Sequence, residues 1–163
     1  IIDSQFDDAI SDAFDGDSVT GTVRSSVFRR IGGDAVDIAS SDIRGNNLIF
    51  QDVNDKAISV GEASRADFYD VVISDVGIGI VAKDNSIANA RNVTINRAEL
   101  AGIAAYQKKP EYGPARIYAD DIEFVETKEV ALVQKRSVMI VNSVEIPGTD
   151  INVESFYEQP ESD

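Results

Sequence analysis

Large apolar residues recur along this chain at a regular step of about 22 residues, a period typical of solenoid repeats. The residues that share the spacing are Phe6, Phe28, Phe50, Ile73, Ile95, Phe124 and Ile146. Their successive positions differ by 22, 22, 23, 22, 29 and 22. A step of this length indicates a repeat architecture, in which each unit packs against its neighbours.

We call a set of residues at equivalent positions of successive repeats a column, and the seven large apolar residues above are the anchors. Other columns recur at the same step. Three places before each of these anchors stands a small polar turn former: Asp3, Ser25, Asn47, Asp70, Asn92, Asp121 and Ser143. Six or seven places after six of them stands a small residue, which is followed by an apolar one: Ala13-Phe14, Ala35-Val36, Ala57-Ile58, Gly79-Ile80, Gly102-Ile103 and Ala131-Leu132. A third apolar column comprises Ile43, Ala66, Ala88, Ile117 and Met139.

Short stretches of alternating polar and apolar residues lie between the turn formers, and this alternation is typical of strands with one buried face. Three such strands within one repeat leave no room for a helix. One coil cannot bury its own inward face, whereas stacked coils close a continuous core and pair their backbones. The sequence therefore predicts an all-β parallel β-helix of about six or seven coils. Leucine-rich and calcium-binding nonapeptide repeats are rejected because their motifs are missing.

The columns, together with phrases such as residues 33–38 (GDAVDI) and 55–61 (DKAISVG), resemble the right-handed parallel β-helix repeat family within the pectate-lyase-like superfamily. The resemblance covers about Phe6 to Ile146 and implies a right-handed, single-stranded solenoid. The superfamily includes polysaccharide lyases, hydrolases, epimerases, carbohydrate-binding modules and structural spacers, so the fold alone selects no activity. Residues 77–145 are also similar to β-helix modules of bacterial envelope proteins.

Composition excludes several classes of function. The chain has 29 acidic and 15 basic residues and a net charge of −14, which disfavours binding to nucleic acid or anionic membranes. Histidine and cysteine are absent, which removes Ser-His-Asp and Cys-His catalysis and any disulfide. No apolar run is long enough for membrane insertion, and no signal peptide is recognisable. We expect no cofactor.

The sequence offers weak candidates for metal binding and for catalysis. An acidic cluster near the N-terminus does not meet the EF-hand spacing, so we expect at most a weak surface Ca²⁺ site there; its members are Asp7, Asp8, Asp12, Asp15 and Asp17. A lyase needs a basic residue beside acids on an exposed strand face. The candidate bases are Arg29, Arg30, Lys56, Lys83 and Arg97, and none has a recognisable family motif. We therefore assign no catalytic residue.

One insertion interrupts the repeat. The step between Ile95 and Phe124 exceeds the usual one by seven, and residues 107–113 account for the excess. Pro110 cannot donate to a strand ladder and Gly113 permits a turn, which predicts an exposed loop. Insertions on solenoids often mark a binding face. The candidate ligand-binding residues are therefore Tyr106, Lys108, Lys109, Tyr112 and Arg116.

The ends complete the expected organisation. We expect one domain over residues 1–157, with Val153, Phe156 and Tyr157 capping the last coil, and a solvated tail over residues 158–163. The chain begins with Ile1 and shows no full N-terminal cap, which favours an upstream region of the same polypeptide. The functional expectation is a non-catalytic module of a bacterial surface or secreted protein, acting as a rigid spacer or as a platform that binds carbohydrate or another protein domain. The alternative is a polysaccharide lyase or a related carbohydrate-active enzyme.

Overall fold

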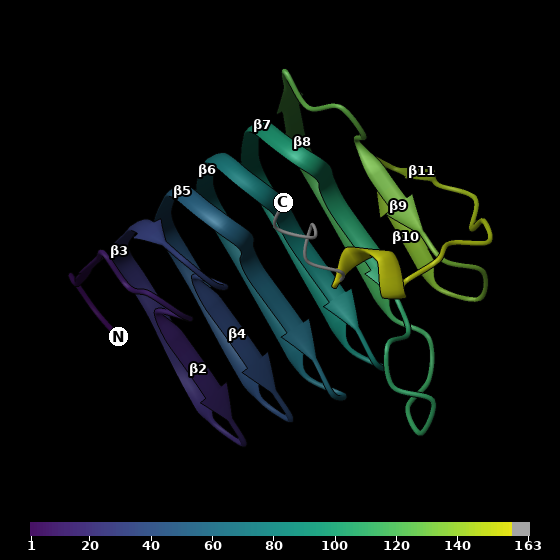
Figure 1. Ribbon diagram of the computed structural model, residues 1–163, viewed down its shortest axis with the longest axis horizontal. Coiled ribbons are helices and arrows are strands. Elements are labelled where there is room, and N and C mark those ends of the chain that lie inside the picture. Colours follow the sequence, from purple (N-terminus) through teal and green to yellow (C-terminus); the bar gives the residue numbers. More distant parts are fainter. Residues whose placement is uncertain (158–163) are drawn as a thin grey trace, which may run out of the picture.

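A computed structural model describes residues 1–157 and shows a parallel β-solenoid of about six turns, stacked from the N-terminal end to the C-terminal end (Figure 1). All eleven strands belong to one sheet. They are β1 (Gln5–Asp7), β2 (Phe14–Asp17), β3 (Thr20–Ile31), β4 (Val36–Ala39), β5 (Asp42–Gly61), β6 (Arg65–Lys83), β7 (Ile87–Tyr106), β8 (Arg116–Val125), β9 (Ala131–Val133), β10 (Val138–Val141) and β11 (Val144–Glu145). A single 3₁₀ turn, η1 (Glu154–Phe156), completes the described elements.

The long strands bend twice, so each turn of the solenoid passes through three flat faces. We call the first the open face; it contains residues 42–46, 65–69, 87–91 and 116–120 and their neighbours in β3 and β10. The middle face follows and carries the Phe and Ile anchors. The third, the covered face, contains residues 36–39, 56–61, 78–83, 101–106 and 131–133 together with β2.

The predicted column of polar turn formers lies at the corner between the open and middle faces, except for Ser143, which lies in a chain reversal after β10. All seven residues, from Asp3 to Ser143, have a positive φ, between 48° and 68°. Asp and Asn tolerate this left-handed conformation because their short side chains bond the local backbone. The column prediction is confirmed, and these side chains explain how the chain turns without glycine.

A second column of positive φ values marks the next corner, and the sequence analysis missed it. Its members are Asp8, Arg30, Asp52, Asp75, Arg97 and Glu126. Arginine and glutamate are not typical turn-forming residues, so the residue types at these positions did not predict a corner. Here the long side chains link successive coils, because Arg30 makes two hydrogen bonds to Asp8 and Arg97 makes two to Asp75.

The core matches the predicted anchors over six coils. Phe6, Phe28, Phe50, Ile73, Ile95 and Phe124 pair in register, each directly beside the next. The first three rings stack with centroids 4.7 and 5.0 Å apart, and Phe28 and Phe50 are fully buried. The third apolar column, from Ile43 to Met139, is also in register and buried. This continuous column is the hydrophobic core of the solenoid.

The prediction for the seventh anchor is wrong. After β10 the chain reverses at Asn142 and Ser143, which both have positive φ, and β11 pairs antiparallel with β10. Two consecutive left-handed residues form the turn that favours a tight hairpin. Ile146 therefore donates its N–H to the carbonyl of Met139 and packs at the end of the core, outside the anchor column.

Two further expectations need correction near the C-terminus. Ile103 pairs with Ala131 rather than Leu132, because the corner after Phe124 is one residue shorter than the corner after Ile95. The apolar residues Val153, Phe156 and Tyr157 do not cap the last coil. They pack on the outside of the covered face, against β6 and β7, together with Leu132 (Figure 1). The predicted tail, residues 158–163, lies outside the described residues.

The predicted insertion is confirmed as a loop. Residues 107–113 contain no strand and connect β7 to β8, while Ile87 still pairs with Arg116 and Ile95 with Phe124 (Figure 1). The carboxylate of Asp84 anchors the start of the loop, because its Oδ1 accepts the backbone N–H groups of Lys108 and Lys109, each at 2.7 Å.

Candidate binding face

The open face directs alternate side chains outward in straight rows, because neighbouring coils are in register. One row runs through Arg44, Asp67, Asn89 and Tyr118. The adjacent row runs through Asn46, Tyr69, Arg91 and Asp120. The residues between these positions point inward; among them Phe68 fills the space beside Gly45, where a Cβ atom would lie 2.2 Å from the phenyl ring.

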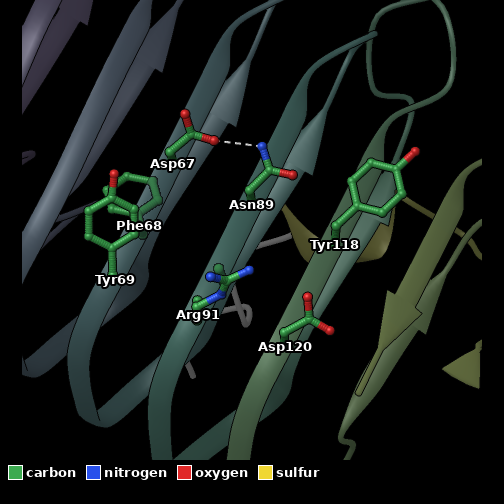
Figure 2. Close-up of a pocket in the computed structure, with 8 residues that line it drawn as sticks. Asp67, Phe68, Tyr69, Asn89, Arg91, Tyr118 and Asp120 are labelled. Carbon is green, nitrogen blue, oxygen red and sulfur yellow. Dashed lines mark hydrogen bonds between the residues drawn. The ribbon is translucent and has the colours of Figure 1, made fainter. Parts of the chain in front are cut away.

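A shallow hollow of about 290 Å³ lies across strands β6, β7 and β8 of this face (Figure 2). Tyr69 and Tyr118 stand on either side of it, and their side chains are among the exposed large hydrophobic groups of the chain, at 41% and 37%. Arg91 and Asn89 rise from β7 between the two rings. The hollow is lined by Asp67, Phe68, Tyr69, Asn89, Ala90, Arg91, Tyr118 and Asp120.

Hydrogen bonding orders one side of the hollow. The side-chain amide of Asn89 donates to Oδ1 of Asp67 at 2.6 Å, which fixes the orientation of that amide. The side chains of Arg91 and Asp120 make no hydrogen bond or ion pair to any residue within 1–157. The hollow thus offers an unpaired guanidinium, two carboxylates and an amide between two phenol rings.

The charge on this face differs from that of the whole chain. Five arginines project from it, in a chain whose net charge is −14: Arg24, Arg44, Arg65, Arg91 and Arg116. None of them makes an ion pair within the described residues, whereas Arg30 and Arg97 at the second corner are both paired. Unpaired guanidinium groups are available for planar, bidentate contacts with carboxylates.

The five residues predicted as a ligand site do not come together on one surface. Tyr106 is fully buried on the covered face, with its hydroxyl 2.6 Å from that of Tyr157, so its ring has no free surface for a sugar. Burial raises the pKa of Tyr106. Lys108 lies over the Tyr157 ring with its Nζ 3.7 Å from the centroid, and Lys109 pairs with Glu62.

Of the remaining two predicted residues, Tyr112 lies beside Lys109, because its backbone N–H donates to the Lys109 carbonyl at 3.1 Å, and Arg116 lies apart. Tyr112 is half-buried in the loop, where its carbonyl accepts a hydrogen bond from the side chain of Gln107. Arg116 begins β8 and lies on the open face, in register with Ile87 and Val138. Of the predicted set, Arg116 alone shares a face with the hollow.

Four of the five bases considered for lyase chemistry are engaged in ion pairs, among them Arg30 and Arg97 at the second corner. The fifth, Arg29, makes no ion pair within the described residues, and its Nε is buried without a hydrogen-bond partner. Lys56 is buried beside Asp34 and Asp55 on the covered face, and Lys83 pairs with Asp37. In the N-terminal acidic cluster, Asp8 is paired with Arg30 and Asp12 accepts the backbone N–H of Asp34. Among residues 1–157, no group of three or more acidic side chains is arranged to hold a metal ion.

The sequence analysis missed Tyr69, Arg91 and Tyr118. Their spacing was a usable signal, since Tyr69 and Arg91 are one repeat apart, and Arg91 and Asp120 have the same separation as Ile95 and Phe124. The signal lies in the outward-facing columns, whereas the apolar columns and the insertion point to the core and to the loop.

Comparison with known proteins adds no relative: no protein-family model, no curated protein and no solved structure matches the chain. Within the described part of the chain there is no helix with the length and hydrophobicity that a membrane crossing requires. The fold and the geometry of the faces therefore carry the functional argument.

Proposed function

We propose that this chain is a non-catalytic β-helix module of a bacterial surface or secreted protein, related to the pectate-lyase-like superfamily, which binds carboxylate-bearing carbohydrate through its open face. The observation that carries the proposal is the hollow in which unpaired Arg91 lies between Tyr69 and Tyr118. The regular core makes the module a stiff support on which this site sits.

Each part of the hollow suits a different part of a sugar. Tyrosine presents a flat apolar ring with a polar tip, which packs on the C–H face of a pyranose. The two tyrosines belong to strands separated by β7, so their backbones lie ~10 Å apart, twice the normal strand spacing. Between them, Asp67, Asn89 and Asp120 offer hydrogen-bonding groups to hydroxyls.

Arg91 supplies the preference for acidic sugars. Its guanidinium can bind a carboxylate through two parallel hydrogen bonds, and the other arginines of the face add favourable potential along a longer chain. Because the rest of the protein is strongly acidic, an anionic glycan would be repelled from most of the surface and directed to this face.

Isothermal titration of the chain with oligogalacturonate, and with a neutral oligosaccharide of the same length, tests the proposal. We expect the acidic oligomer to bind, Arg91→Met to weaken that binding by about tenfold or more, and Tyr118→Ala to weaken it similarly. Arg97→Gln is the matched control, since it removes an exposed arginine from another part of the surface. No binding by the unmodified chain, or equal binding by all variants, would refute the proposal.

A lyase is the second candidate, and one observation favours it: Arg91 lies beside Asp67 and Asp120 on an exposed strand face, the constellation that such chemistry needs. The hollow has no loop walls among its lining residues, so little excludes water or bends a substrate. We expect no unsaturated products on incubation with pectate or alginate. Accumulation of ultraviolet-absorbing products that depends on Arg91 would establish the lyase instead.

A further inference from the structure

The covered face holds a lysine buried between two carboxylates, apart from the proposed binding site. The side chain of Lys56 is 2% exposed and that of Asp34 is 7% exposed. The Nζ atom of Lys56 lies 3.2 Å from Oδ1 of Asp34 and 2.5 Å from Oδ2 of Asp55. A lysine is almost never buried to this degree without a specific partner.

The repeat itself brings Lys56 and Asp34 together. Asp12, Asp34 and Lys56 occupy equivalent positions in successive coils, and each aspartate accepts the backbone N–H of the residue one coil further on. The Lys56 N–H reaches Oδ1 of Asp34 at 2.9 Å. This backbone donor fixes the carboxyl group of Asp34 next to the lysine side chain of the following coil.

The C-terminal segment closes this site from outside. Phe156 and Tyr157 pack over the covered face, and the hydroxyl of Tyr157 is 2.6 Å from that of Tyr106. The Tyr157 ring lies over Lys56, with Nζ 5.3 Å from the centroid. Aromatic side chains thus shield the Lys56 and Asp34 side chains from bulk water.

The burial has an electrostatic consequence. It raises the pKa of Asp34 to about 6, although the Lys56 ammonium opposes the shift. Burial by itself lowers the pKa of Lys56, but Asp34 and Asp55 outweigh it and the net shift is upward. Two opposite charges held in contact and away from water can exchange a proton and become a neutral amine and a neutral acid.

We propose that Lys56 and Asp34 condense to an intramolecular isopeptide bond, with Asp55 as the proton carrier. A proton first passes from the Lys56 ammonium to Oδ2 of Asp34. The amine lone pair then attacks Cγ of Asp34, the new N–C bond forms, and the negative charge develops on Oδ1. Asp55 takes one proton from the nitrogen and delivers it to the Oδ2 hydroxyl, the C–O bond breaks, and one water leaves.

The geometry supports the approach of the reacting groups and the stabilisation of the developing charge. The reacting groups are already in contact, so no entropy of approach is lost. The Lys56 backbone N–H donates to the oxygen on which negative charge develops. The product removes two buried charges and joins adjacent coils by a covalent bond between equivalent positions of the repeat. Closure by Phe156 and Tyr157 limits the return of water that would hydrolyse the amide.

Intact mass spectrometry of the full chain under denaturing conditions tests the proposal. We expect a mass lower than that of the sequence by one water molecule. Succinimide formation at Asp15-Gly16 would give the same loss, so Lys56→Arg and Asp34→Ala are essential controls. Both variants keep Asp15-Gly16 and should show the full sequence mass.

Tryptic digestion locates the bond. Acylated Lys56 resists trypsin, so the expected product is a branched peptide in which residues 31–44 are joined to residues 45–65. Asp55→Asn should retain the folded circular dichroism spectrum and show the full sequence mass. An unmodified chain with the full sequence mass would overturn the proposal, and loss of water from Asp55→Asn to the wild-type extent would overturn the role of Asp55.

Discussion

The open face and the covered face are formed by the same strands, β5, β6 and β7, but they differ in whether charged side chains are exposed or buried and paired. On the open face Arg91 is exposed and has no ion-pair partner within residues 1–157. On the covered face Lys56 is buried and contacts two carboxylates. The difference arises because Phe156 and Tyr157 lie over one face, while the described residues leave the other accessible.

This comparison separates two uses of one scaffold. A charge that is covered must be compensated within the protein, because burying an unpaired ion is costly. An exposed charge carries no such requirement and can select a ligand instead. In this solenoid the outward rows of one face therefore serve structure, and those of another are free to serve recognition.

The largest difference in stability between the two faces should appear when Lys56 of the covered face and Arg91 of the open face are each replaced. Lys56→Met leaves Asp34 buried without its partner and should lower the free energy of unfolding by ~3–5 kcal/mol. Arg91→Met should change it by less than about 0.5 kcal/mol, as is usual for an exposed side chain. Urea denaturation of both variants measures the two values. Similar losses in both would remove the distinction between the faces.

A smaller contrast is expected for the aromatic residues. Phe156→Ala removes a half-buried ring that packs on β6 and β7 and should cost about 1–3 kcal/mol, less than a fully buried phenylalanine. Tyr118→Ala removes an exposed ring and should leave the unfolding midpoint nearly unchanged. If Phe156→Ala proved neutral, the covered face would not depend on the C-terminal segment.

The smallest effect on stability should come from the corner between the middle and covered faces, where Arg97 pairs with Asp75. Arg97→Gln breaks the two hydrogen bonds to Asp75, but both side chains are nearly half exposed. Ion pairs of this kind contribute little and are screened by salt. We expect the same unfolding midpoint as for the unmodified chain at both low and high ionic strength. A clear, salt-sensitive loss of stability would show that the ion pairs at this corner help to hold successive coils together.

Sequence reasoning predicted the repeat well and the site poorly. Six of seven anchors, the polar corner column and the loop at residues 107–113 lie where the spacing placed them. Ile146 was misplaced because two adjacent left-handed residues make a hairpin, whereas one makes a corner. Tyr106 was misjudged because it is the last residue of β7 rather than part of the loop, and its burial depends on the C-terminal segment around Tyr157, far along the chain.

The sequence by itself determined the solenoid, its period, its inward columns and the position of its insertion. These follow from local chemistry repeated at one step, since each coil needs the same pattern to pair with the next. The tertiary structure alone decided which outward rows stay exposed. That depends on where the C-terminal segment packs, which no repeat encodes, and it is why Tyr69, Arg91 and Tyr118 remain accessible while Lys56 and Tyr106 are buried.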